Sequence, residues 1–302
     1  MSAPTKLHLR LPATSANLGP GFDALGLAMA LYLTIDATEA ASFHIKATGR
    51  NADLCGTLKD NLILRTYAEV LTSSGRESIP YLHLDIHNEI PLGMGCGSSA
   101  AALLAGVLLA NHFGNLNWTT QQILEEACRR EGHPDNVAAC ALGYLTVSAV
   151  SDGAVAAATC GQGLPWKLLL ALPSASLATE RARALLPTAY SRADAVYNVQ
   201  RTGLLIAAFA LNRGDLLRVA MQDRLHEPYR MEACPLLPLL LPLAGEPRIW
   251  GVSLSGAGPG MLLIVEPDAD TAKLADRIRC AAGDPALEIL ETGIAAGVSV
   301  TK

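Results

Sequence analysis

Residues 91–113, PLGMGCGSSAAALLAGVLLANHF, constrain the fold more than any other stretch of this chain. Glycines at alternate positions 93, 95 and 97 are followed by two serines and then by a run that is apolar on nearly every side. A helix without a polar face has to be buried inside a packed domain. The glycines before it permit positive φ angles and a close approach of the backbone. The segment therefore predicts a glycine loop that leads into a buried helix at residues 98–113.

Such a loop is suited to phosphate. The first N–H groups of a helix have no partner within the helix, and the helix dipole favours negative charge there. Ser98 and Ser99 can cap the helix or offer hydroxyl groups to a phosphate or a metal. A Walker A loop would need a lysine before Ser98, and a dinucleotide fingerprint would need GxGxxG with an acid about 20 residues on. A phosphate loop of another type remains, with a plain glycine turn and serine cap as the alternative.

Polar and apolar residues alternate or recur at helical spacing through the rest of the chain. Strands are predicted at residues 6–11, 27–37, 42–48, 81–90, 144–150, 154–159, 166–172, 249–254 and 261–265, with two short strands at the end. Helices are predicted at residues 61–74, 98–113, 119–130, 135–141, 179–186, 193–211 and 271–282, with a broken helix at 235–243 because of its prolines. The hairpin-like order favours an α+β fold, with a division near residues 152 and 153.

Composition excludes several classes of protein. The 302 residues are 50% hydrophobic and carry a formal net charge of −5, which argues against a nucleic-acid partner. The most apolar stretch, 98–109, is shorter than the about 20 residues that span a bilayer. The start of the chain lacks the apolar centre of a signal peptide. Seven cysteines without a CxxC pair indicate free thiols in a reducing compartment. We expect a soluble cytoplasmic protein without a membrane partner.

Five motifs resemble those of a known superfamily. PLGMGCGSSAA is similar to the second motif of the GHMP small-molecule kinases, with Cys96 where leucine is usual, and LSGAGPG at 254–260 is similar to their third. Three further stretches resemble the homoserine kinases within that superfamily. They are PATSANLGPGFDALGLAM at 12–29, EGHPDNVAA at 131–139, and TERARALLP at 179–187 with HEPYR at 226–230. The resemblance spans nearly the whole chain.

The resemblance implies a function and a fold. It implies ATP-dependent phosphorylation of the side-chain hydroxyl of L-homoserine to O-phospho-L-homoserine, a step toward threonine. The implied architecture is an N-terminal ATP-binding domain like ribosomal protein S5 domain 2 at residues 1–152, then a ferredoxin-like domain at 153–302. ATP and Mg²⁺ are the implied cofactors, and a homodimer is the implied assembly.

The nucleotide and metal residues follow from the same resemblance. The phosphate loop would comprise Pro91, Gly93, Gly95, Cys96, Gly97, Ser98 and Ser99, and Asn61 would contact adenine or ribose. Mg²⁺ takes oxygen ligands, for which Ser98 and Glu131 are the candidates. Glu125 is the alternative, since some homoserine kinases place the acid further before the histidine. Gly256, Gly258 and Gly260 either support the site or form a simple hairpin.

Homoserine is a zwitterion, so its site needs a carboxylate for the ammonium and arginine for the carboxylate. The resemblance makes Asn17 and Asp23 substrate contacts, although Asp23 could instead cap a turn. Arg183 and Arg230 match the two arginines that hold the substrate carboxylate, with Thr179 beside Arg183. His133 and Asn136 lie in the segment that lines the substrate hydroxyl.

One departure from the superfamily concerns the mechanism. Several GHMP kinases use an aspartate base with a nearby lysine, but PATSAN contains no lysine and Asn136 occupies the aspartate position. We therefore expect direct phosphoryl transfer without a side-chain base, through positioning and through charge neutralisation by Mg²⁺, the loop amides and the helix dipole at Ser98. Asp23 stays open as a base.

Two other functions remain possible on sequence grounds. The first is another GHMP kinase that acts on a small hydroxylated acid or a similar small hydroxyl compound. The pairing of Arg183 and Arg230 with Asp23 favours an amino acid over a sugar as the substrate. The second is a regulator that binds ATP and a ligand without catalysis. Such a protein should have lost its metal or phosphate residues, whereas Ser98 and Glu131 are both present.

Overall fold

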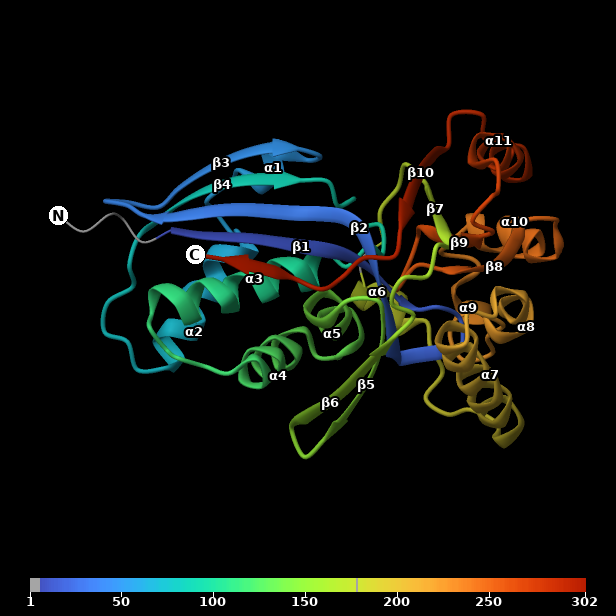
Figure 1. The fold of residues 1–302 in the computed structure, drawn as a ribbon, viewed down its shortest axis with the longest axis horizontal. Helices are drawn as coiled ribbons and strands as arrows, with labels where there is room; N and C mark the ends of the chain where they lie inside the picture. The colour runs from blue at the N-terminus through green and yellow to red at the C-terminus, as the bar shows by residue number, and fades with distance from the viewer. Residues whose placement is uncertain (1–5, 178) are drawn as a thin grey trace.

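A computed structural model describes residues 6–177 and 179–302 (Figure 1). The strands form a seven-stranded and a four-stranded sheet, accompanied by helices, which confirms the expected α+β fold. Figure 1 shows the larger sheet lying over helices α2 to α5, with the smaller sheet at the other end of the molecule. Among the residues described, no helix has the length and apolar character needed to cross a membrane.

The seven-stranded sheet is built on a long hairpin. Its path runs β11-β1-β2-β4-β3, while β5 pairs with β2 and with β6, and only β3 and β4 are parallel. Its strands are β1 (Lys6–Asn17), β2 (Gly21–Glu39), β3 (His44–Gly49), β4 (Leu82–Asn88), β5 (Leu145–Ser151), β6 (Ala154–Cys160) and β11 (Ser299–Thr301).

The first two strands are longer than the sequence pattern predicted. The second half of β1 and the turn into β2, residues 11–21, are buried without interruption. A strand covered on both faces shows no alternation of polar and apolar residues, so its pattern carried no strand signal. The prediction began β2 at residue 27, whereas the strand begins at Gly21 and includes Asp23.

Helix α3 (Ser98–Phe113) lies at the centre of the first part and is buried along most of its length, as expected. It packs on α2 (Leu62–Ser73), α4 (Thr120–Glu131), α5 (Asp135–Leu142) and strand β1, whereas the short α1 (Ala52–Cys55) contacts β3 and β4. Thr119 caps α4 with a capping box. The serine cap that the sequence allowed is not formed: the N-cap of α3 is Gly97, in the left-handed conformation, and no side chain caps the helix.

The four-stranded sheet has the order β10-β7-β9-β8 and is antiparallel. Its strands are β7 (Lys167–Leu172), β8 (Ile249–Leu254), β9 (Met261–Val265) and β10 (Glu288–Gly293). The helices of this part are α6 (Thr179–Ala184), α7 (Arg192–Ala210), α8 (Leu217–Ala220), α9 (Glu227–Arg230), α10 (Leu236–Leu240) and α11 (Thr271–Ala282). With β7, α7, β8, β9, α11 and β10 as its units, this is the β-α-β-β-α-β arrangement of ferredoxin-like domains.

The two parts share the chain unevenly. The division expected at residues 152 and 153 lies in the turn between β5 and β6, and both of these strands belong to the larger sheet. Strand β11 also returns to that sheet from the end of the chain. If the chain is divided according to which sheet each strand joins, the first part therefore ends after Cys160 and also includes residues 299–301.

Candidate active site

Two neighbouring cavities meet at the start of α3. The first, of about 190 Å³, is lined mainly by polar and charged side chains and by the glycine loop, and we call it the polar cavity. The second, of about 310 Å³, is lined mainly by leucine and isoleucine side chains, and we call it the apolar cavity. Ser98 and Ser99 line both cavities. A ligand with an apolar end and a charged end could therefore span the helix N-terminus.

The glycine loop could not be built from other residues. Gly93, Gly95 and Gly97 have φ angles of +69°, +75° and +69°, a region that favours glycine. A Cβ on Gly95 would overlap the carbonyl oxygen of Ser255, and one on Gly97 would overlap the Thr14 hydroxyl. The Ser255 hydroxyl donates to the Gly95 carbonyl oxygen at 2.9 Å, which fixes the loop against the segment 254–260.

The N-terminus of α3 is open toward both cavities. Because no side chain caps its first amides, and because the helix runs for 16 residues, its positive end is available to an anion. The left-handed glycines bring the loop backbone close to the same point. The donor set of this loop therefore fits the phosphates of a nucleotide.

Asn61 lines the apolar cavity, but its amide is already engaged. Its Oδ1 accepts hydrogen bonds from the amides of Ile63 and Leu64, at 3.1 and 3.2 Å, and caps α2. Its Nδ2 donates to the carbonyl oxygens of Cys55 and Thr57 at 3.2 Å. Asn61 thus shapes the wall of the cavity, and Lys59, which the sequence reading did not single out, lines it as well.

Asp23 and Arg183 form an ion pair in the wall of the polar cavity. The Arg183 guanidinium donates to both carboxylate oxygens of Asp23, at 2.5 and 3.1 Å. This hydrogen bond raises the pKa of Arg183 against the opposing effect of burial. Asn17 Oδ1 accepts from the Asp23 amide at 3.1 Å, and Asn17 Nδ2 donates to the Gly256 carbonyl oxygen at 2.9 Å. Asn17 therefore holds the turn that carries Asp23.

Arg230 is a buried cation beside this pair, with 1% of its surface exposed. In the described part of the chain its hydrogen bonds go to the carbonyl oxygens of Ala182 and Gly256 and to His226 Nδ1, and none of these is a carboxylate. Burial and the nearby Arg183 lower the pKa of Arg230. A buried guanidinium in a cavity wall, without an acidic partner, fits an anionic group of a ligand.

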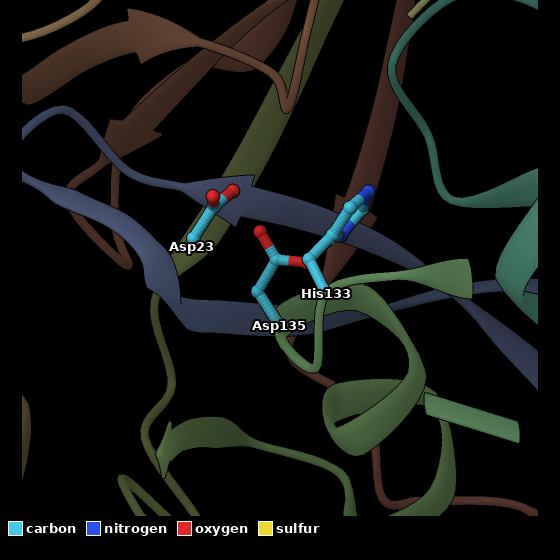
Figure 2. A group of neighbouring side chains, drawn as sticks. All are labelled: Asp23, His133 and Asp135. Atoms are coloured by element: carbon cyan, nitrogen blue, oxygen red, sulfur yellow. Dashed lines mark hydrogen bonds and ion pairs between the residues drawn. The ribbon is translucent and has the colours of Figure 1, made fainter. Parts of the chain in front are cut away.

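Three side chains of the polar cavity wall, Asp23, His133 and Asp135, lie close together (Figure 2). Asp23, His133 and Asp135 each offer one ligand atom within 4.8 Å of the others, which would also suit a cation. Asp135 Oδ1 lies 2.7 Å from His133 Nδ1 and accepts from the Asn136 amide at 2.7 Å. Burial lowers the pKa of His133, but the hydrogen bond and charge of Asp135 outweigh it and raise the pKa.

Asp135 is the functional candidate that the sequence reading missed. Its place in HPDN, between two residues that were chosen, was the available signal. Asn136 lies in the same wall, where its Oδ1 accepts from the Thr14 hydroxyl at 2.7 Å. The side-chain amide of Asn136 therefore points toward the base of the glycine loop.

Glu131, at the end of α4, reaches the same cavity. The Ser99 hydroxyl donates to Glu131 Oε2 at 3.1 Å. Burial raises the pKa of Glu131. The alternative acid, Glu125, accepts from Gln121 and lines a separate surface hollow near Val155. Glu131 and the two serines are the oxygen donors that stand beside the helix N-terminus, where a divalent cation would be expected.

The structure brings together most of the residues that the sequence singled out. The following line the polar cavity: Asn17, Asp23, Gly93, Gly95, Cys96, Gly97, Ser98, Ser99, Glu131, His133, Asn136, Arg183, Arg230, Gly256 and Gly258. Pro91 is buried just before the loop. The side chain of Thr179 lies outside what the structure describes. Gly260 supports the loop from beneath, because a Cβ there would overlap the carbonyl oxygen of Met94.

Comparison with known proteins gives consistent matches. Residues 61–144 match the GHMP kinases N terminal domain, and residues 205–284 match the GHMP kinases C terminal domain. The chain is 49% identical to the homoserine kinase of Solibacter usitatus over 86% of this chain and 85% of that protein. It is 41% identical to that of Desulfitobacterium hafniense, over 86% and 87%. The crystal structure of homoserine kinase from Cytophaga hutchinsonii superposes with a TM-score of 0.82 at 23% identity, over 100% and 99% of the two chains.

Proposed function

Because the chain belongs to the homoserine kinases of the GHMP kinase superfamily, we propose that its two cavities bring ATP and L-homoserine together at the N-terminus of α3. The activity is the transfer of a phosphoryl group to the side-chain hydroxyl of L-homoserine, a step of threonine biosynthesis. The observation that carries the site assignment is the charge arrangement of the polar cavity, which opens onto a glycine loop suited to phosphate.

The polar cavity complements a zwitterion. Arg230 and Arg183 offer guanidinium groups to the substrate carboxylate, and Asp23 and Asp135 offer carboxylates to the ammonium. We assign His133 to the wall nearest the substrate hydroxyl, because its ring is held by Asp135. Thr179 stays a weaker candidate beside Arg183. A neutral sugar would leave the buried Arg230 without a counter-charge, which favours an amino acid over galactose.

GHMP kinases use ATP with Mg²⁺. In this chain we assign the phosphates to the loop from Gly93 to Ser99 and the adenosine to the apolar cavity. The nucleotide would then be bound by the part built on the larger sheet, for which the sequence predicted residues 1–152. Ser98 and Glu131 are the proposed metal ligands, with Ser99 orienting Glu131 through its hydroxyl. Mg²⁺ would supply charge neutralisation of the phosphates at this point.

We propose transfer without a side-chain base. Asn136 cannot accept a proton, and its Oδ1 is occupied by the Thr14 hydroxyl. The loop amides and the helix dipole stabilise negative charge on the phosphate, while Asp23, Arg183 and Arg230 hold the acceptor in place. A loose transition state gains little from early deprotonation of the acceptor.

Asp23→Asn tests this mechanism against Asp23 acting as the base. We expect the substitution mainly to raise the KM for L-homoserine, since it removes a charge from the ammonium site. A fall in kcat of a hundredfold or more at unchanged affinity for L-homoserine would mean that Asp23 is the base and that the proposal is wrong.

The same proposal includes a homodimer in the cytoplasm. The exposed apolar side chains Val196 and Val199 of α7 offer a surface for a second copy. Light scattering of the parent and of Val199→Asp would measure the mass of each. A monomeric parent would reject the dimer, and a dimeric variant would reject this surface.

A coupled assay of ADP release tests the substrate assignment. The panel is L-homoserine, L-threonine, L-serine, D-homoserine, mevalonate and galactose, each with Mg-ATP. We expect turnover with L-homoserine alone. Turnover with mevalonate or galactose would retain the fold and discard the substrate, and ATP binding without any turnover would favour a regulator.

A further inference from the structure

His226 is a fully buried histidine that none of the proposed catalytic steps uses. It lies directly before α9, the short helix that carries Arg230. Its ring stacks on Phe22 with centroids 5.3 Å apart, and Phe22 lines the polar cavity between the two arginines. The guanidinium carbons of Arg183 and Arg230 lie 5.5 and 5.7 Å from the centre of the Phe22 ring.

Two hydrogen bonds connect this ring to Arg230 and to the turn at Gly19. His226 Nδ1 lies 3.1 Å from the Arg230 guanidinium, which can only donate, so Nδ1 is the acceptor. His226 Nε2 lies 2.8 Å from the carbonyl oxygen of Gly19, which can only accept, so Nε2 carries the proton. The two contacts together require a neutral ring in a single tautomer.

The contact to Gly19 reaches the turn that carries the substrate residues of β1 and β2. Gly19 lies between Asn17 and Asp23 in the sequence, and a Cβ on it would overlap the carbonyl oxygen of Met221. The next carbonyl, that of Pro20, accepts from Asn198 and Thr202 of α7 at 3.2 and 2.9 Å. The turn is thus held by side chains of the C-terminal part.

The buried carboxylate of Asp223 holds the backbone at His226 in place. Asp223 accepts from the amides of His226 and Glu227, each at 2.8 Å, and from Asn198 Nδ2 at 2.6 Å. Burial lowers the pKa of His226 despite the opposing charge of Asp223. The neutral form that the two hydrogen bonds require is therefore also the form that the surroundings favour.

We propose that His226 is a positioning residue for substrate binding: it aligns the Arg230 guanidinium with the turn at Gly19, and so sets the distance between the carboxylate-binding and ammonium-binding sides of the polar cavity. This inference rests on the proposed function of that cavity. His226 acts through Arg230 and Gly19 and does not itself line the polar cavity.

Three substitutions at His226 test its two hydrogen bonds separately. His226→Asn keeps an acceptor near the place of Nδ1 and loses the donor to Gly19. His226→Gln keeps a donor near the place of Nε2 and loses the acceptor for Arg230. His226→Phe keeps the stacking on Phe22 and loses both hydrogen bonds. His112→Phe is the control, because His112 is partly buried at the far end of α3 and its Nε2 has no partner among the described residues.

We expect His226→Phe to raise the KM for L-homoserine by about tenfold or more, since a buried charged group loses its hydrogen bond. The KM for ATP should stay within about twofold, because the glycine loop is untouched. His226→Asn and His226→Gln should each recover part of the loss, and His112→Phe should match the parent. Calorimetric binding of L-homoserine and melting temperatures for each variant accompany the kinetics.

Unchanged KM for L-homoserine in all three variants would overturn the proposal. Equal increases in both KM values would do the same, since they would indicate a general loss of structure. If His226→Phe does not fold, the comparison of His226→Asn and His226→Gln with the parent decides. A parent that binds and phosphorylates no homoserine would instead reject the proposed function, which keeps the two failures distinct.

Discussion

Asp23 and Arg183 bind each other in the wall of the polar cavity, although one belongs to β2 of the larger sheet and the other to α6 of the C-terminal part. Both side chains are about one-third exposed, at 34% and 37%, so the pair contributes little to stability. Each group is the counter-charge of one end of a zwitterion. A bound amino acid could replace this ion pair with two, one at each end.

Arg183→Ala is expected to weaken substrate binding selectively. Loss of a two-pronged charged contact costs about 2–3 kcal/mol, or about 30- to 150-fold in the KM for L-homoserine. The KM for ATP should change by less than about twofold. Steady-state kinetics with each substrate varied in turn would measure this. Arg213→Ala, which removes an exposed ion pair with Asp215, is the control, and an equal effect of both substitutions would contradict the assignment.

Glu131→Gln is expected to raise the Mg²⁺ concentration needed for half-maximal activity by about tenfold and to lower kcat, since a metal ligand loses its charge. Glu125→Gln should behave like the parent because Glu125 lies in a different hollow. Titration of activity with Mg²⁺ at saturating ATP checks both variants. The reverse order of effects would make Glu125 the metal ligand.

Gly97→Ala and Gly203→Ala should have opposite effects. A Cβ on Gly97 meets the Thr14 hydroxyl at a positive φ, so we expect a loss of about 2 kcal/mol or more in stability and of ATP binding. A Cβ on Gly203, inside α7, meets no atom within 4 Å, so we expect a gain of about 0.5–1 kcal/mol at unchanged activity. Urea unfolding and nucleotide binding would be measured for both, and tolerance of alanine at 97 would refute the role of the loop geometry.

Glu227→Gln is expected to stabilise the protein at high pH. Burial, with a smaller effect of Asp223, raises the pKa of Glu227 from its usual value of 4.5 to about 8. Between these values the unfolded chain releases the proton while the folded protein retains it, so stability falls as pH rises. The glutamine removes this loss, on the order of 4 kcal/mol at pH 8, and can still accept from the Leu254 amide.

Thermal unfolding of the parent and Glu227→Gln at several pH values from 4.5 to 8 would test this. The variant should melt near the parent at pH 4.5 and several degrees higher at pH 8. A difference that stays constant with pH would show that Glu227 is not protonated in the folded protein.

The sequence predicted the glycine loop, helix α3 and most elements, because periodicity and glycine spacing are local signals. It did not predict the extent of β1 and β2, since burial on both faces removes the alternation from which strands are recognised. The cap role of Asn61 and the contact of Glu131 with Ser99 were also not predictable, because both depend on how separate segments approach each other.

The partners of the charged side chains could not be predicted from the sequence either. Arg183 and Arg230 were chosen by their motifs, but spacing could not reveal that Arg183 pairs with Asp23 or that Arg230 is buried against His226. Asp135 stood between two chosen residues, and only its distance to Asp23 and His133 makes it a candidate. Motifs identified the segments, while the side-chain partners required the fold.

Strand β11 pairs with β1, although β1 precedes every strand of the smaller sheet in the chain and residues 299–301 follow them all. The smaller sheet lies wholly between them in the chain. The larger sheet therefore cannot be completed before the smaller sheet has been synthesised, and the nascent chain carries an unpaired edge of β1 until then. Pairing over such a sequence distance slows folding, which makes the pairing of β11 with β1 a late step in forming the larger sheet.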